Sequence, residues 1–156
     1  MDKRLIAVRI RGSVNVNRDI EETLGLLGLK RVNNAVLIDN RPSYKGMLQT
    51  AKDYITWGEA DVESVSTVLK NRGEVVGNEK LTDAFVKANS KFKSIEDFSK
   101  AFVEFKAELK DLKGLKKVFR LHPPRKGHSG IKKAYTTGGS LGNRKTEIKG
   151  LIRKMR

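Results

Sequence analysis

The chain has 156 residues, which is enough for one ordinary domain or two small ones. Lysine and arginine number 33 against 18 aspartates and glutamates, so the formal charge is +15 and the expected partner is a polyanion, above all nucleic acid. The absence of cysteine excludes disulfide bonds, thiolate metal sites and a nucleophilic thiol, and it fits a reducing compartment. No apolar run is long enough for a membrane span, and residues 5–8 are too short a run for a signal peptide. We therefore expect a cytoplasmic protein.

The excess charge is concentrated at the C-terminal end. Residues 118–156 contain 11 basic side chains and one acidic one, Glu147, and carry +10, whereas residues 1–76 carry +2 and residues 77–117 carry +3. In a Gly-rich segment this asymmetry is typical of an extension that embraces RNA, because like charges repel until phosphates neutralise them. A disordered solubilising tail is the alternative. We expect the segment to fold when it binds RNA.

Three short segments in the first 60 residues have the patterns of strands. Residues 5–11 alternate between apolar and other side chains, which predicts a half-exposed strand. Residues 35–38 form a short apolar run, and residues 54–57 combine aromatic and β-branched side chains, so both predict further strands. Helical patterns separate these segments, and the predicted order of elements is βαβαβ.

Capping residues mark the ends of three predicted helices. Asn17 is expected to cap the first helix, which stops at Gly28, and Ser43 is expected to cap the second. Asp61 is expected to cap a third helix that ends near Gly73. The first two helices fall between the predicted strands and the third follows them.

A second helical region is predicted further along the chain. Ser94, with Asp97 three residues later, resembles a capping box and precedes a long apolar stripe at helical spacing. Phenylalanines on or near this stripe are candidate platforms for stacked bases, but their helical spacing favours a place in the core. The stripe consists of Ile95, Phe98, Ala101, Phe102, Phe105, Leu109 and Leu112, and Phe92 lies just before it.

Charge and pattern together divide the sequence into three regions. Residues 1–76 are the βαβαβ module with its following helix, residues 77–117 are the helical region, and residues 118–156 are a basic Gly-rich extension for RNA binding. The extension shows no lasting periodicity between His122 and Lys145. It ends in a predicted short docking helix whose apolar residues are Ile148, Leu151, Ile152 and Met155.

The sequence gives little support for catalysis or metal binding. Its two histidines, His122 and His128, flank the loop HPPRKGH, and no carboxylate or further imidazole lies nearby to complete a metal site or orient a general base. The stretch GGSLGNRKT superficially resembles a phosphate-binding loop, but a Walker loop needs glycine immediately before its lysine, where Arg144 stands. We predict no enzymatic activity, no metal and no cofactor.

Polar and basic residues at the predicted turns and in the extension are candidate RNA ligands. Two prolines are expected to stiffen a path along which basic side chains meet successive phosphates, and glycines further on permit close approach to an RNA groove. Tyr44 and Tyr135 are candidates for stacking on unpaired bases or for packing, and Tyr135 is preferred for stacking. The predicted RNA-binding residues are Arg9, Arg11, Ser13, Arg18, Lys30, Arg31, Asn33, Asn34, Arg41, Tyr44, Lys45, Arg120, His122, Arg125, Lys126, His128, Lys132, Lys133, Tyr135, Asn143, Arg144 and Lys145.

Two stretches at opposite ends of the chain follow the pattern of a known family. The first contains Thr23, Leu24, Leu27, Leu29, Arg31, Asn34 and Val36, then the turn RPSYKG, then Met47, Leu48, Ala51, Tyr54 and Ile55. The second is the ending GGSLGNRKTEIKGLIRKMR. In these residues the chain resembles the universal large-subunit ribosomal proteins of the L-thirty family, called L-seven in eukaryotes. The stretch DYITWGE is similar to the archaeal and eukaryotic branch, and the lack of a long basic N-terminal extension favours an archaeal member.

The resemblance covers essentially the whole chain and implies both a fold and a function. The implied fold is α+β: a small βαβαβ module whose three-stranded antiparallel sheet has helices on one face, a helical insertion, and an extended basic C-terminal segment. The implied function is a non-enzymatic role in the large subunit, where the protein binds the large ribosomal RNA near the five-S RNA and neighbouring ribosomal proteins. Neither a membrane nor a small-molecule substrate is expected.

Two other classes of function remain open on the sequence alone. A general RNA chaperone would bind many sequences with similar affinity, whereas a ribosomal protein should protect discrete RNA segments. An RNA-processing factor that used His122 or His128 would lose turnover, but not binding, when that histidine is replaced.

Overall fold

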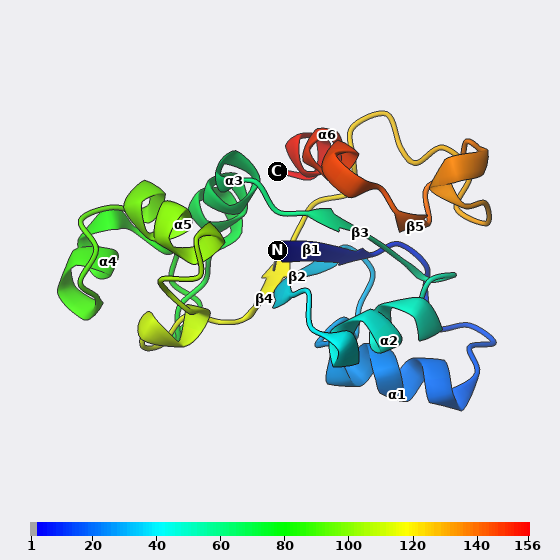
Figure 1. The fold of residues 1–156 in the computed structure, drawn as a ribbon, viewed down its shortest axis with the longest axis horizontal. Helices are drawn as coiled ribbons and strands as arrows, with labels where there is room; N and C mark the ends of the chain where they lie inside the picture. Colours follow the sequence, from blue (N-terminus) through cyan, green and yellow to red (C-terminus); the bar gives the residue numbers. More distant parts are fainter. Residues whose placement is uncertain (1–2) are drawn as a thin grey trace.

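A computed structural model describes residues 3–156, and its centre is a five-stranded sheet (Figure 1). β1 (Arg4–Arg9) lies in the middle and pairs antiparallel with β2 (Asn34–Asp39) on one side and with β3 (Ile55–Glu59) on the other. β4 (Val118–Arg120) pairs antiparallel with β2, and β5 (Gly142–Asn143) pairs parallel with β3. The order across the sheet is therefore β4-β2-β1-β3-β5.

The three strands predicted in the first 60 residues are confirmed, but the expected three-stranded antiparallel sheet is wrong. The sheet is mixed and has five strands, because the C-terminal segment contributes one strand to each edge. β4 has three residues and β5 has two, and an alternating pattern cannot be recognised over so few residues. The α+β class holds.

Two helices cover one face of the sheet. α1 (Arg18–Leu26) and α2 (Pro42–Thr50) lie side by side below the sheet in Figure 1. Leu24 and Leu48 from these helices are completely or almost completely buried against it. The apolar core on this side consists of Leu5, Ala7, Leu24, Leu27, Leu29, Val36, Ile38, Leu48, Ala51 and Ile55.

Helices also cover the opposite face, so the expectation of helices on one face only is wrong. α3 (Val62–Arg72) and α6 (Ile148–Met155) pack there against Ile6 and Val8 of β1. All six residues of β1 are buried in consequence, including Ala7 and Arg9, whose alternation with Ile6 and Val8 suggested an exposed face. A strand between two layers of helices has no solvent-facing side.

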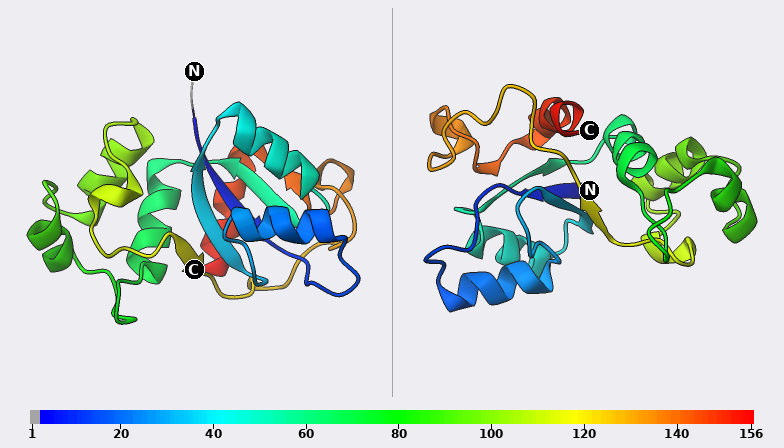
Figure 2. Two further views of the ribbon diagram at one scale, coloured as in Figure 1. Left: turned by 90° about the horizontal axis from the view of Figure 1, so that it is seen from below. Right: turned by 180° about the vertical axis from the view of Figure 1, so that it is seen from behind.

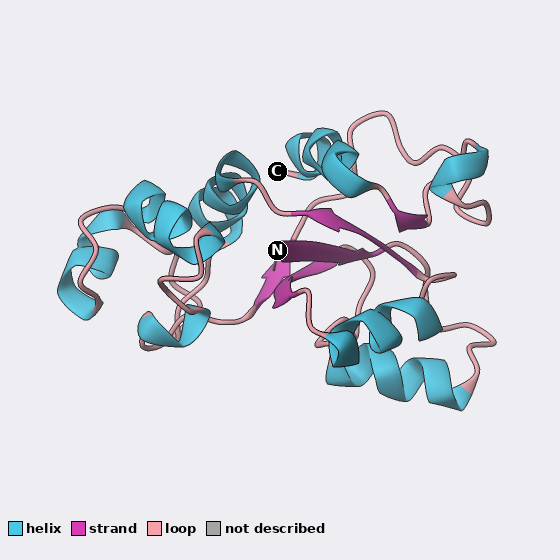
Figure 3. Cartoon of the chain, in the orientation of Figure 1, coloured by secondary structure: helices cyan, strands magenta, loops and turns pink. Residues whose placement is uncertain are grey.

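The helical region extends the molecule beyond one end of the sheet. Its helices lie at the left of Figure 3, in which all helices are cyan and the strands of the sheet are magenta. It contains α4 (Asp83–Asn89), which the sequence did not predict, and α5 (Ile95–Val103), which packs against α3. Phe98 and Phe102 are buried in the core that these helices share with the sheet, so the interpretation of the phenylalanines as core residues is confirmed for these two.

The prediction of one long helix through Leu112 is wrong. α5 ends at Val103, and Phe105 adopts a left-handed conformation with φ of 60° and is 41% exposed. Ala107 and Leu112 are nevertheless buried in the same core, because the chain turns back after Phe105 and packs them from irregular structure. An apolar stripe can therefore continue past the end of its helix.

Two of the expected helix caps form as side-chain hydrogen bonds. The side chain of Asn17 accepts a hydrogen bond from the Asp19 amide, and that of Ser94 accepts one from the Asp97 amide. Gly28 follows α1 in a left-handed conformation with φ of 80°. These residues satisfy backbone groups that have no partner inside the helix.

The other expected caps differ. Ser43 is not the cap of α2, because Pro42 occupies the first turn and Arg41 stands at the capping position without a side-chain hydrogen bond. Proline suits that place, since the amide it lacks would have no helical partner there. Asp61 precedes α3 as predicted, but its side chain makes no capping hydrogen bond, and Gly73 ends the helix.

The C-terminal segment folds back over the sheet edge and ends in the predicted helix, α6 (Figure 2). Between β4 and α6 the chain forms short 3-10 turns at Tyr135–Thr137 and Lys145–Glu147. Ser140 and Leu141 are buried beside β5, and the Arg144 amide donates to the Trp57 carbonyl at 2.8 Å. Within residues 3–156, no helix combines the length and apolar character that crossing a membrane requires.

Candidate nucleic-acid interface

The edge of the sheet at β4 carries a basic groove, which we call the edge groove. It has a volume of about 550 Å³ and is lined by Gly28, Lys30, Arg31, Asn34, Glu74, Lys116, Lys117, Val118 and Arg120. Five cationic side chains thus face one carboxylate. The loop between α1 and β2 supplies one wall and the approach to β4 supplies the other. Such a groove attracts the phosphates of a polyanion.

The structure brings four predicted residues together in the edge groove, namely Lys30, Arg31, Asn34 and Arg120. The sequence reasoning missed Lys116 and Lys117, because they lie in a region whose charges nearly balance. Two adjacent lysines immediately before a strand were the available signal. Lys116 is partly neutralised, since its Nζ atom lies 3.2 Å from a Glu74 carboxylate oxygen.

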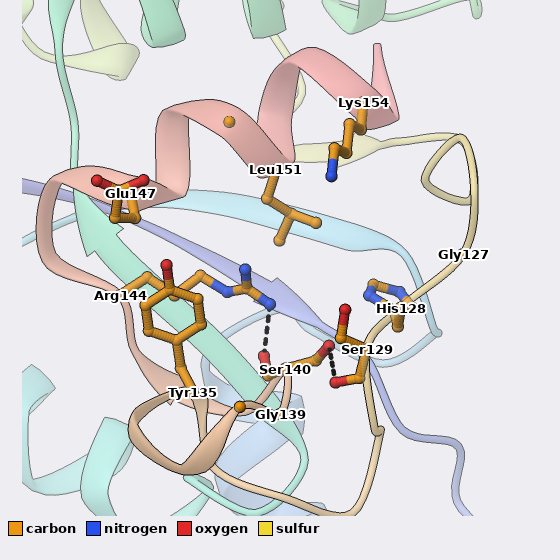
Figure 4. Close-up of a pocket in the computed structure, with 12 residues that line it drawn as sticks. Gly127, His128, Ser129, Tyr135, Gly139, Ser140, Arg144, Glu147, Leu151 and Lys154 are labelled. Atoms are coloured by element: carbon orange, nitrogen blue, oxygen red, sulfur yellow. Dashed lines mark hydrogen bonds between the residues drawn. The ribbon is translucent and has the colours of Figure 1, made fainter.

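A second hollow lies under α6, and we call it the tail pocket (Figure 4). It has a volume of about 290 Å³. Three predicted residues, His128, Tyr135 and Arg144, line it together, although they are spread over the C-terminal segment. The complete lining is Gly127, His128, Ser129, Tyr135, Gly138, Gly139, Ser140, Arg144, Glu147, Gly150, Leu151 and Lys154. Sequence reasoning missed Lys154, which the terminal helix presents.

Arg144 is the best-held side chain of the tail pocket. Its Nε donates to the Thr56 hydroxyl at 2.9 Å, and its Nη2 donates to the Ser140 carbonyl at 3.0 Å. The guanidinium carbon lies 4.6 Å from the centre of the Tyr135 ring, which is a cation–π distance. Burial lowers the pKa of Arg144, but a guanidinium remains charged in proteins. A fixed positive plane therefore faces the pocket.

His128 is the neutral member of the tail pocket. Burial lowers its pKa, and the nearby Arg144 charge lowers the pKa further, so both favour the neutral imidazole. Its Nδ1 atom is buried and has no hydrogen-bond partner among the described residues. His122 lies apart from this pocket, exposed at the start of the loop, and its amide donates to the Met155 carbonyl.

Arg9 was predicted to contact RNA, but the structure places it in the interior with 1% of its surface exposed. Its guanidinium donates to the carbonyls of Arg11, Leu29 and Lys30 at 2.8 to 2.9 Å and to the Ser13 hydroxyl at 2.9 Å. These bonds tie the loop after β1 to the loop after α1. Arg9 therefore shapes two loops that carry other predicted ligands and is not itself available to a phosphate.

Several predicted residues of the first region already have partners. Arg11 donates to the Asp53 carbonyl and lies 4.8 Å from the centre of the Tyr54 ring. Arg18 forms an exposed ion pair along α1 at 2.9 Å, and Arg41 forms one with Asp39 at 2.7 Å. Asn33 adopts a left-handed backbone conformation. On α2, Lys45 is exposed, whereas the neighbouring Tyr44 is partly buried against the apolar core between the helices and the sheet.

The remaining predicted residues of the C-terminal segment are exposed outside the two hollows. Asn143 lies on β5 and its side chain accepts a hydrogen bond from the Lys145 amide at 2.8 Å. Lys145 begins the 3-10 turn after β5. The others lie on the loops that connect β4 to β5 and are Arg125, Lys126, Lys132 and Lys133. Among residues 3–156, no group of three or more histidine, aspartate or glutamate side chains is arranged to hold a metal ion.

Comparisons with known proteins identify the family. Residues 5–55 match the family described as Ribosomal protein L30p/L7e. The chain is 51% identical over 148 residues to the large ribosomal subunit protein uL30 of Methanopyrus kandleri, covering 94% of this chain and 99% of the relative. It is 51% identical over 149 residues to the uL30 protein of Archaeoglobus fulgidus, covering 96% of this chain and 97% of the relative. The chain therefore belongs to the uL30 family of large ribosomal subunit proteins.

Proposed function

We propose that the protein is a non-enzymatic structural constituent of the large ribosomal subunit that binds ribosomal RNA and stabilises its fold. Its near full-length likeness to proteins named for that subunit supports a role in the ribosome and therefore in the cytoplasm. The observation that carries RNA binding is the state of the basic segment 118–156. Of its 11 basic side chains, Lys149 and Arg153 are the two that pair with a carboxylate of the described chain, and both use Glu63.

Unpaired cations on a folded surface favour binding through release of counterions. Each phosphate that a lysine or arginine neutralises frees condensed cations, so affinity falls as the salt concentration rises. The edge groove lies at β4 and the tail pocket lies beside β5, which are the two opposite edges of the sheet, so the RNA contacts span the module. Recognition then depends on backbone geometry and on junctions more than on base sequence.

The family resemblance also supports a position near the five-S RNA and beside neighbouring ribosomal proteins. We include both in the proposal, with the large ribosomal RNA as the principal partner. Stability of the assembled RNA, and not turnover of a substrate, is then the outcome of binding.

The test is the affinity of the purified protein for transcribed large-subunit ribosomal RNA, measured over a range of salt concentrations. We expect log affinity to decrease linearly with log salt concentration. Combining Lys30→Gln with Lys117→Gln should make this line shallower by about two units of slope, since each substitution removes one phosphate contact. Lys91→Gln combined with Lys93→Gln makes the same charge change on the helical region and should leave the slope unchanged. Equal affinity for an unrelated RNA would contradict the proposal and favour a general RNA chaperone.

A further inference from the structure

The tail pocket is large enough to receive a ligand group. Its volume of about 290 Å³ is close to the lower end of the range for small-ligand sites, roughly 300 Å³. A single water molecule occupies about 30 Å³, so the hollow is not a site for one ordered water. α6 forms its roof, and the turns around Gly127 and Gly139 form its sides (Figure 4). The space fits a flat group of several atoms.

One wall of the pocket is a platform for stacking. The Arg144 guanidinium lies against the Tyr135 ring on one side and is held in place by Thr56 and Ser140. The planes of arginine guanidinium groups stack on unpaired RNA bases. Leu151, which is 6% exposed, adds an apolar wall on α6. A planar group between Arg144 and Leu151 would have a charged plane on one side and an aliphatic surface on the other.

The rim of the pocket offers hydrogen-bonding groups of both kinds. His128 lines the pocket, and its buried Nδ1 atom has no hydrogen-bond partner among residues 3–156, which costs free energy until the imidazole ring turns and a ligand pairs with it. Lys154 and Glu147 also line the pocket, and neither forms an ion pair within residues 3–156. Donors beside acceptors suit the edge of a base. A phosphate alone would be repelled by Glu147, so the mixture favours a base over a bare phosphate.

We propose that the tail pocket receives the base of one unpaired nucleotide of ribosomal RNA, stacked on Arg144 and hydrogen-bonded at its edge by His128. Lys154 then meets the phosphate of the same nucleotide at the mouth of the pocket. The inference rests on the proposed function, because it names what one part of the RNA interface binds. Shape specificity follows, since only a junction with a free base at this distance from the edge groove can occupy both sites.

Gly150→Phe is the sharpest test, because it fills the pocket without disturbing the fold. Gly150 lines the pocket from α6, and a Cβ atom added there meets nothing within 4 Å. Replacing glycine inside a helix also favours the helix. Gly25→Phe is the matched control, since Gly25 lies on α1, has equally open space and does not line the tail pocket.

Each variant is bound to transcribed large-subunit ribosomal RNA and probed in two ways. Hydroxyl radicals report on protection of the RNA backbone, and dimethyl sulfate and carbodiimide report on the reactivity of unpaired bases. We expect the native protein and Gly25→Phe to protect one unpaired base that Gly150→Phe leaves reactive, with the rest of the backbone footprint retained. Affinity should weaken about tenfold in Gly150→Phe, as expected for the loss of one stacked base.

A second variant, His128→Ala, separates blocking of the pocket from loss of its contacts. It should also expose the same base, although it makes the pocket larger instead of smaller. Identical base reactivity and affinity in the native protein, Gly150→Phe and His128→Ala, on an intact backbone footprint, would overturn the pocket and leave the proposed function standing. Absence of any specific footprint from the native protein would instead overturn the proposed function.

Discussion

Two arginines near the N-terminus are interior residues whose charges hold separate parts of the chain together. Arg4 is 6% exposed and forms an ion pair with Asp39 of the neighbouring strand. It also donates to the carbonyls of Phe102 and Ala107 and lies 4.1 Å from the centre of the Phe105 ring. Arg4 thus joins the sheet to the turn that follows α5, as Arg9 joins two loops at the other end of β1.

Replacing Arg4 by methionine should destabilise the protein by about 2 kcal/mol, because it removes the hydrogen bonds to the Phe102 and Ala107 carbonyls and leaves Asp39 with only its ion pair to the exposed Arg41 side chain. The measurement is the free energy of unfolding in urea. Arg18→Met is the matched control, since its ion pair with Glu22 is exposed and worth at most about 0.5 kcal/mol. Equal effects of the two substitutions would show that the Arg4 contacts do not stabilise the fold.

His128 should make the stability of the protein depend on pH. Its pKa is lowered by burial and by Arg144, so the unfolded chain takes up a proton at higher pH than the folded chain. The contribution of neutral His128 to the stability of the fold is therefore complete above the pKa of histidine in the unfolded chain, about 6.5. It is lost as the pH falls from there through the lower pKa of His128 in the folded chain.

Urea unfolding at pH 7.5 and at pH 5 measures this effect. The native protein should lose more stability between the two pH values than His128→Gln, in which the titrating group is absent. A loss of stability that is the same in the native protein and the variant would contradict the assignment.

At the scale of elements, α6 depends on a glycine in the strand beneath it. Gly58 lies on β3, where an added Cβ atom would come within 2.6 Å of the Ile148 Cβ and would also meet the Lys145 carbonyl. No real Cβ atom fits there unless α6 moves. Only glycine lets this part of the chain approach the sheet so closely.

Gly58→Ala should therefore destabilise the protein by about 1–3 kcal/mol through overpacking. Gly46→Ala provides the opposite case, because Gly46 is on α2 with nothing within 4 Å of an added Cβ atom, and it should stabilise the protein by about 0.5–1 kcal/mol. Thermal unfolding followed by circular dichroism measures both. An unchanged melting temperature in Gly58→Ala would show that α6 is not seated as described.

Sequence patterns predict the elements that are long and regular and miss those that other segments create. β1, α1, α3 and α6 follow from periodicity and end signals that each contain in themselves. β4 and β5 exist because a neighbouring strand offers an edge, and no local pattern encodes that. Arg9 was predicted to contact RNA for the same reason, since the Leu29 carbonyl to which it donates lies 20 residues away along the chain.

The candidate interface is predictable to a similar degree. His128, Tyr135 and Arg144 were three of the predicted RNA-binding residues, but the sequence did not predict that they line one hollow. Lys154 and Lys117 join the two hollows only through the fold, and the one local signal is the pair of lysines at Lys116 and Lys117. Charge predicts which segment faces a polyanion, whereas convergence of side chains depends on tertiary structure.

At the scale of the whole molecule, the basic C-terminal segment is part of the fold. It supplies both edge strands and a helix whose Ile148 and Met155 are completely buried. The sequence predicted a segment that folds when it binds RNA, but the burial of these residues leads us to expect that it is already folded before RNA arrives. Burial of its apolar residues offsets the repulsion among its charges.

An NMR spectrum of the free protein measures this directly. For Leu141 and α6 we expect amide signals with dispersed chemical shifts and protection from hydrogen exchange. For the exposed loop around Lys132 we expect narrow amide signals that exchange rapidly with water. Random-coil amide shifts throughout residues 118–156 would contradict the packing and restore coupled folding and binding.

The central claim is that the protein is a constituent of the large ribosomal subunit, and crosslinking in its own cells tests it most directly. The tagged protein is crosslinked, washed stringently, and the attached RNA is sequenced. We predict crosslinks at a few discrete sites of the large-subunit ribosomal RNA. Crosslinks scattered over messenger RNA, transfer RNA or DNA would contradict the account.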